Sequence, residues 1–353
     1  MKIYENELYL SDVKIIAEMN LPWQKLQDCS ILISGASGLV GSFLIDVLMM
    51  RNKQYDLNCK VFALGRNAQR AKDRFEYCWD DYNFLFVSHD INLPLTIEGV
   101  KKVDYVLHLA SNTHPVAYST EPISTITTNI IGTHNMLDFA VSHESKRMAF
   151  ASSNEIYGEN RGDVEKFEED YCGYIDCNTL RAGYPESKRC GEALCQAYKS
   201  QKGLDIVIPR LTRSYGPTLL QTDTKAMSQF IKKAIAGEDI LLKSEGNQYY
   251  SYTYVADAVS GLLTVLLLGE NGEAYNIADE ASDIKLKDLA KVIADIVGTE
   301  VVFELPDAVE SAGYSKATKA RLSNNKITLL GWKANYSINE GIKNTINIIK
   351  EVV

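Results

Sequence analysis

The chain has 353 residues, of which 46% are hydrophobic and 24% are charged, and its formal net charge is −9. This composition is that of an ordinary globular protein, long enough for one large α/β domain with an appendage or for two domains. The acidic balance argues against a nucleic-acid binder, although an anionic small ligand stays possible. No apolar run approaches the roughly 20 residues of a membrane-spanning helix, and residues 1–7 lack the order of a signal peptide. We therefore expect a cytoplasmic protein without a nucleic-acid or membrane partner.

The first half of the chain alternates short apolar runs with helical segments. A short amphipathic pattern within residues 1–28 predicts an N-terminal extension that packs on the main domain. Buried strands are then expected at 30–34, 60–64, 84–87, 103–109, 147–152 and 204–209, with a helix at 41–50 after the first strand. Such alternation predicts βαβ units and a parallel sheet. The expected fold class is α/β, with a Rossmann-type doubly wound sheet in residues 29–215.

The pattern changes after residue 215. Helices are expected near 225–236 and 255–268, interspersed with short strands, and the chain ends in an amphipathic helix at 338–350. We interpret residues 216–353 as mainly a smaller substrate-binding lobe, interleaved with the first domain.

Seven cysteines are scattered through the chain, and two pairs have C-x4-C spacing, at 172/177 and 190/195. This is not a usual zinc spacing, and an odd number of scattered cysteines is typical of reduced thiols in a cytosolic protein. No metal site is predicted.

A glycine-rich segment follows the first expected strand directly. Its spacing is G-x-x-G-x-x-G at Gly35, Gly38 and Gly41. Glycines between a strand and a helix let the backbone approach a pyrophosphate and point the helix N-terminus at its charge. Tight helix–strand packing is the alternative explanation. The dinucleotide interpretation predicts cofactor contacts from Gly35, Ser37, Gly38, Leu39, Val40 and Gly41.

The end of the second strand usually reads the adenosine ribose. An acid there accepts from a free 2′-hydroxyl, whereas an arginine accommodates a 2′-phosphate. This chain has Arg66 and no acid, which favours NADP weakly over NAD unless Arg66 is only a solvated arginine. Asp90 and Ile91 follow the third strand, where they could contact adenine or cap the loop.

Tyr184 and Lys188 are spaced i and i+4, so on a helix they share one face. A neighbouring ammonium favours the phenolate and would lower the pKa of the tyrosine, which could then take a proton from a carbinol. A surface pair without function is the alternative. The preceding glycine loop and strands favour proton transfer.

Together these motifs resemble the extended short-chain dehydrogenases/reductases of the nucleotide-sugar epimerase/dehydratase family. The resemblance runs from about residue 29 to the C-terminus. It rests on the glycine loop, Tyr184 to Lys188, and segments at 104–110, 129–135, 152–158, 215–217, 254–257, 275–277 and 330–332.

The resemblance implies tightly bound NAD or NADP and oxidation at C4 of a nucleotide sugar. Epimerisation, loss of water or decarboxylation then follows, according to the enzyme. It assigns Tyr184 as the base, Lys188 as its electrostatic partner and Ser153 as the hydroxyl that binds the sugar oxygen. It adds cofactor contacts at Leu109, Ala110, Ser111 and Asn129. It also implies a homodimer formed through the helix that carries Tyr184 and the one before it.

Glu155 and Asn154 bear on the branch of the family. Dehydratases and glucuronate decarboxylases resemble this chain in having glutamate at position 155, and a carboxylate there can move the acidic C5 proton of a 4-keto sugar. A loop hydrogen bond is the alternative role. Dehydratases carry aspartic acid where this chain has Asn154, which has no titrating proton to donate. This difference favours decarboxylation.

Arg213 and Tyr250 depart from the family pattern in the later lobe. Decarboxylases are similar in a Gly-x-Gln-x-Arg segment, but here Tyr250 stands at the place of the arginine. Arg213 stands where the family usually has asparagine. An arginine can bind a diphosphate or a carboxylate, so Arg213 either compensates for Tyr250 or makes a structural ion pair. Thr113 is a further candidate for substrate contact.

The sequence thus predicts an NAD(P)-dependent nucleotide-sugar dehydratase or decarboxylase acting through a 4-keto intermediate in nucleotide-sugar or surface-polysaccharide biosynthesis. A C4 epimerase or 4-keto reductase is the alternative within the family. A non-catalytic dinucleotide-binding regulator is the alternative outside it, because a fold does not fix a function.

Overall fold

The computed structural model describes residues 1–113, 115–304 and 318–352. A central sheet in this part of the chain has the order β12-β7-β5-β4-β1-β2-β3, and the short β6 pairs with β7. Every pairing in the sheet is parallel. The strands are β1 (Ser30–Ser34), β2 (Lys60–Gly65), β3 (Phe84–Ser88), β4 (Tyr105–His108), β5 (Arg147–Phe150), β6 (Ser152–Ser153), β7 (Ile206–Leu211) and β12 (Ala274–Ile277).

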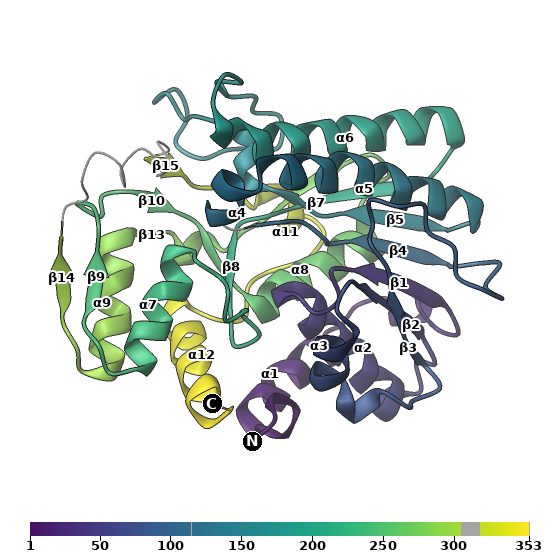
Figure 1. Ribbon diagram of the computed structural model, residues 1–353, viewed down its shortest axis with the longest axis horizontal. Coiled ribbons are helices and arrows are strands. Elements are labelled where there is room, and N and C mark those ends of the chain that lie inside the picture. The colour runs from purple at the N-terminus through teal and green to yellow at the C-terminus, as the bar shows by residue number, and fades with distance from the viewer. Residues whose placement is uncertain (114, 305–317, 353) are drawn as a thin grey trace.

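Helices cover both faces of this sheet (Figure 1). Alternate residues of a strand point to opposite faces. Ile31 and Ile33 accordingly belong to one buried cluster, with α2 (Leu39–Tyr55) and α8 (Val255–Leu268). Leu32 belongs to the other, with α5 (Pro122–Ser142) and α6 (Gly183–Lys202). The predicted doubly wound α/β fold is confirmed.

The pairing of β7 with β5 and β6 is interrupted at Ile208 and Pro209, without a change of register. Met148 and Ala149 of β5 pair with Ile206 and Val207, and the pairing resumes only where Ser152 of β6 meets Arg210. Proline has no N–H to give to a ladder, so it fits this interruption. The predicted strand at 204–209 therefore lies two residues further along, and it delivers Ser153 to the carboxyl edge of the sheet.

The later part of the chain forms three small sheets flanked by helices. The sheets join β8 (Arg213–Tyr215) to β11 (Tyr252–Tyr254), β9 (Ile240–Leu242) to β14 (Val301–Phe303), and β10 (Tyr249–Tyr250) to β13 (Ile284–Lys285) and β15 (Lys319–Ala320). The helices are α7 (Ala226–Ile235), α9 (Leu286–Val297), α11 (Asn325–Thr328) and α12 (Ile338–Val352). Because α8 and β12 from this part join the main sheet layer, the two regions interleave.

The N-terminal segment packs beside the C-terminal helix (Figure 1). In α1 (Glu7–Ala17), the buried Asp12 accepts hydrogen bonds from the hydroxyls of Tyr254 and Tyr336. Burial raises the pKa of Asp12. These contacts tie the extension to the second lobe as well as to α2 and α8.

The remaining elements are short: α3 (Ala68–Arg74), α4 (Pro115–Thr120), and the 3-10 turns η1 (Ile3–Glu5), η2 (Trp23–Lys25), η3 (Glu76–Cys78), η4 (Asn154–Tyr157), η5 (Leu180–Ala182) and η6 (Glu280–Ser282). All seven cysteines, which lie in the described part of the chain, are free thiols. No helix among the described residues is long and apolar enough to cross a bilayer.

Candidate active site

The glycine loop lies between β1 and α2, against the end of β4. Gly35 has a φ of +70°, and a Cβ on it would lie 2.9 Å from the backbone nitrogen of Ala110. A Cβ on Gly41 would lie 2.4 Å from the carbonyl oxygen of Gly35. Side chains at these two positions would close the loop, while Gly38 caps the start of α2. The loop and the helix N-terminus therefore fit a pyrophosphate.

The end of β2 offers cations rather than a carboxylate. Arg66 follows Gly65, the last residue of β2, and its side chain is exposed. The Arg70 guanidinium donates to the carbonyl of Ser37 in the glycine loop, with Nη2 and O 2.9 Å apart. Two arginines thus stand beside the loop, at the position where a ribose substituent would be recognised.

Asp90 caps its own loop. Its carboxylate accepts from the backbone nitrogen and the side-chain nitrogen of Asn92, each at 3.0 Å. The neighbouring Ile91 is buried, and its side chain packs against Gly132 of α5. The capping role considered from the sequence is therefore present, and an adenine contact from these two residues stays a prediction.

Ser111 and Asn129 link the end of β4 to α5 and α6. The Ser111 hydroxyl donates to Asn129 Oδ1 at 2.7 Å, and Asn129 Nδ2 donates to the Ser187 hydroxyl at 2.9 Å. Leu109 and Ala110 donate their amides to the Ser34 hydroxyl at 3.1 and 3.2 Å. These bonds hold the end of β4 to the end of β1, where the glycine loop begins, and to α5 and α6, the helix that carries Tyr184.

Tyr184 lies at the start of α6 and is buried. Burial raises the pKa of its phenol, and the nearby Glu155 carboxylate raises it further. The Ser153 and Ser111 hydroxyls, within hydrogen-bonding reach, and the Arg181 guanidinium lower the pKa, but they do not outweigh burial. The phenol therefore sits among two hydroxyls and a carboxylate at the edge of the sheet.

Lys188 shares the buried face of α6 with Tyr184. Its ammonium donates to the carbonyl of Ala151, with Nζ and O 2.8 Å apart, and burial lowers its pKa to about 8. The sequence predicted a lowered pKa for Tyr184, whereas in this structure the pKa is raised, because burial and the Glu155 carboxylate outweigh the groups that lower it.

Ser153, Asn154 and Glu155 follow one another where β6 runs into η4. The Ser153 hydroxyl accepts from the Glu155 backbone nitrogen at 3.2 Å, and Asn154 is buried beside it. The Glu155 carboxylate forms an ion pair with Arg181, with Oε2 and Nη2 2.7 Å apart. The Glu155 carboxylate lies close enough to Tyr184 to raise the pKa of the phenol.

The second lobe contributes Arg213 and Tyr250. The guanidinium carbon of Arg213 lies 3.6 Å from the centroid of the Tyr250 ring, a cation–π contact. The Nη1 nitrogen of Arg213 is buried and has no hydrogen-bond partner among the described residues, and no ion pair of Arg213 is present there. Arg213 thus forms no structural ion pair with any residue that the structure describes. Thr113 is exposed and accepts from Lys225 at 3.4 Å.

Arg181 and Tyr118 belong to this cluster, although no sequence motif singled them out. The guanidinium of Arg181 lies 4.7 Å from the Tyr118 ring centroid. The Tyr118 ring stacks on that of Tyr184, with centroids 4.8 Å apart and planes 28° apart. The position of Arg181, three residues before Tyr184, was the only available signal.

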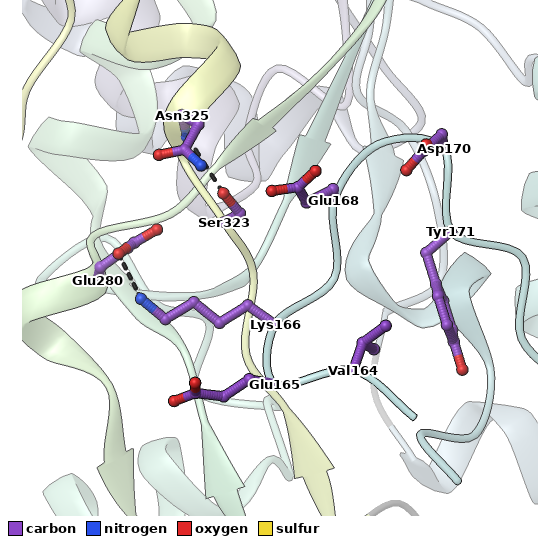
Figure 2. A pocket seen from close by; sticks show the side chains of 9 residues that line it. All are labelled: Val164, Glu165, Lys166, Glu168, Asp170, Tyr171, Glu280, Ser323 and Asn325. Atoms are coloured by element: carbon purple, nitrogen blue, oxygen red, sulfur yellow. Dashed lines mark hydrogen bonds and ion pairs between the residues drawn. The ribbon is translucent and has the colours of Figure 1, made fainter. Parts of the chain in front are cut away.

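A separate hollow of about 500 Å³ lies beside the loop that contains Glu168 and Asp170 (Figure 2). Lys166 forms an ion pair with Glu280 across it. Its other charged lining residues are carboxylates, and none of the predicted site residues lines it. An excess of carboxylates disfavours an anionic nucleotide, so we place the active site at the glycine loop and Tyr184.

These features define a dinucleotide-binding α/β protein of the Rossmann type. A family model described as "NAD dependent epimerase/dehydratase family" matches residues 31–278, and the chain belongs to that family. It is 34% identical to UDP-glucuronic acid decarboxylase 1 of Xenopus tropicalis, over 91% of this chain and 72% of the relative.

Two solved structures share the fold. dTDP-glucose 4,6-dehydratase from Bacillus anthracis, in complex with NAD, has a TM-score of 0.76 and 20% identity, covering 92% of this chain and 97% of that one. UDP-glucuronic acid 4-epimerase from Bacillus cereus, with UDP-glucuronic acid and NAD, has a TM-score of 0.77 and 22% identity, covering 92% and 100%.

Proposed function

We propose that this protein is an NAD(P)-dependent nucleotide-sugar enzyme of the dehydratase/decarboxylase type that works through a 4-keto sugar. The carrying observation is the position of the Tyr184 phenol between the hydroxyls of Ser153 and Ser111 and the Glu155 carboxylate, next to the glycine loop. The names of relatives at 34% and 30% identity, UDP-glucuronic acid decarboxylases, support this choice of branch.

In the first step the site would oxidise C4. A bound nicotinamide would supply the acceptor for the C4 hydride, and Tyr184 would take the proton from the C4 hydroxyl. Ser153 would hold that oxygen through a hydrogen bond, and Lys188 would favour the phenolate from the same helix face. Because the pKa of Tyr184 is raised, this transfer needs the positive charges near the phenol.

In the second step the site would act at C5 and C6. In decarboxylation, the C5–C6 bond breaks, carbon dioxide leaves, and its electron pair passes to the 4-keto group as an enolate. C5 is then protonated, and Glu155 would supply that proton. Return of the hydride to C4, with the Tyr184 proton going back to the C4 oxygen, would complete the cycle. In dehydration, Glu155 would instead remove the C5 proton while hydroxide leaves C6, a departure that needs an acid. Asn154 cannot supply one, so we favour decarboxylation.

The second-lobe wall would bind the acidic part of the substrate. Arg213 is a half-buried cation whose buried Nη1 has no hydrogen-bond partner among the described residues, and such a group is stabilised by an anion. The Tyr250 ring packs against the guanidinium of Arg213. We propose that Arg213 binds the C6 carboxylate or the diphosphate, with Thr113 as a further substrate contact.

For the cofactor, we infer NAD or NADP held by the glycine loop, residues 35–41, with contacts from 109–111 and Asn129. Arg66 favours NADP, because it is a cation near the expected ribose and β2 ends without an acid. We also propose a homodimer formed through α5 and α6, in which exposed apolar side chains such as Ile123 and Ile131 would be covered.

The test is to incubate the purified protein with UDP-, dTDP-, GDP- and CDP-sugars, including UDP-glucuronate, and to follow product masses. With UDP-glucuronate we expect the loss of carbon dioxide, which is about 44 mass units. Loss of water would place the protein with the dehydratases. Unchanged mass with an inverted sugar would establish the alternative, a C4 epimerase, and no change with any donor would contradict the proposal.

A further inference from the structure

Arg181 forms an ion pair with one acid–base group of the proposed site, Glu155, and lies near the other, Tyr184. It lies in η5, directly before α6, and its Nη2 is 2.7 Å from the carboxylate of Glu155. Its guanidinium also lies over the Tyr118 ring, which in turn stacks on Tyr184. The arginine therefore holds the carboxylate against the layer of rings that supports the phenol.

The charges around the phenol explain why this contact matters. Glu155 in η4 raises the pKa of Tyr184, and Arg181 in η5 lowers it. Tyr118 of α4 is neutral, since burial raises its pKa as well, and Lys188 on α6 itself bonds to Ala151. Without Arg181, the Glu155 charge would act on the phenol without compensation, and the phenol would be harder to deprotonate.

A second observation separates Arg181 from an ordinary structural arginine. Its Nη1 nitrogen is buried and has no hydrogen-bond partner among the described residues. Buried donors of folded proteins are nearly always paired, and an unpaired one calls for an explanation. An oxygen of the substrate at this site would satisfy it.

We propose that Arg181 is a positioning residue: it holds the Glu155 carboxylate in place beside Tyr184 and compensates its negative charge. This inference rests on the proposed function, because it gives Glu155 and Tyr184 their roles.

The test measures the pH dependence of C4 oxidation, followed as transient absorbance of the reduced cofactor, in Arg181→Gln and Arg181→Lys. We expect the acid limb of the profile to move up by about one pH unit in Arg181→Gln, and to stay near its original position in Arg181→Lys. The matched control is Arg161→Gln, since Arg161 also lies over a tyrosine ring, at 4.6 Å from Tyr174, but touches none of the site residues.

The Glu155→Gln background gives the stricter test. If Arg181 also holds the Glu155 carboxylate in place, Arg181→Gln should move the acid limb by less in this background than in the wild type, because only the direct effect of the guanidinium on the phenol is then lost. A rate loss at every pH without a shift of the limb, or the same shift in both backgrounds, would overturn the inference. If none of the sugar nucleotides leads to reduction of the cofactor in the wild-type protein, the proposed function fails, and this inference fails with it.

Discussion

The residues at the edge of the central sheet and those contributed by the second lobe differ in how closely they follow the family pattern. Ser153, Tyr184 and Lys188 keep it, and buried hydrogen bonds hold the edge. Arg213 and Tyr250 break it, and they contact each other instead. In the proposed mechanism the edge carries the redox step, which is common to the family, and the lobe carries the choice of substrate.

Replacement of Tyr184 by phenylalanine should have the largest effect, because it removes the proposed base from the edge of the central sheet. We expect turnover to fall by about 10²- to 10⁴-fold. The cofactor should stay bound, since the glycine loop is untouched. Rapid-quench turnover and cofactor stoichiometry measure the two. Tyr118→Phe keeps the stacked ring and is the matched control; full activity of Tyr184→Phe would remove the tyrosine from the mechanism.

Glu155→Gln should separate the two proposed steps, oxidation at C4 and proton transfer at C5. The amide keeps the shape of the carboxylate but cannot exchange a proton, so solvent deuterium should enter C5 on the order of 10² times more slowly. C4 oxidation should continue, as measured by reduced-cofactor absorbance. An unchanged product rate would show that Glu155 only makes the loop contact and the ion pair with Arg181.

The contribution of the second lobe is tested by removing the positive charge of Arg213. Arg213→Asn should weaken binding of an acidic nucleotide sugar by about 10- to 100-fold, because a hydrogen bond to a charged group contributes about 1.5–3 kcal/mol. Its effect on a neutral sugar with the same nucleotide should be small if Arg213 binds the sugar carboxylate. Calorimetric titration of both ligands measures the difference.

The double variant Arg213→Asn with Tyr250→Arg sharpens this test. It returns the cation to the position that the family pattern gives it. Partial recovery of acidic-sugar binding would show that the site needs a charge rather than a particular residue. Equal weakening of acidic and neutral ligands in Arg213→Asn would instead assign the arginine to the diphosphate.

The same contrast governs what the sequence could predict. Strand–helix alternation was sufficient for the parallel sheet, and helix α8 was predicted at its observed bounds, because local periodicity carries that information. The edge strand β12 was missed, since four residues with Asn276 among them have no strand signal. Arg181, Tyr118 and the direction of the Tyr184 pKa depend on contacts between segments, which no local pattern contains.

The smallest effect is expected at the end of β2, where we propose that Arg66 distinguishes NADP from NAD. Arg66→Gln should weaken NADP binding by about tenfold, as expected for loss of one exposed phosphate contact. NAD binding should not change. Arg70→Gln is the matched control: Arg70 bonds to the Ser37 carbonyl, so its loss should loosen the glycine loop and weaken both dinucleotides alike. Fluorescence titration of cofactor-stripped protein measures all four affinities. Equal affinity of the Arg66→Gln variant and the wild type for NADP would leave Arg66 as a solvated side chain and remove the argument for NADP, since no acid at the end of β2 marks the site for NAD either.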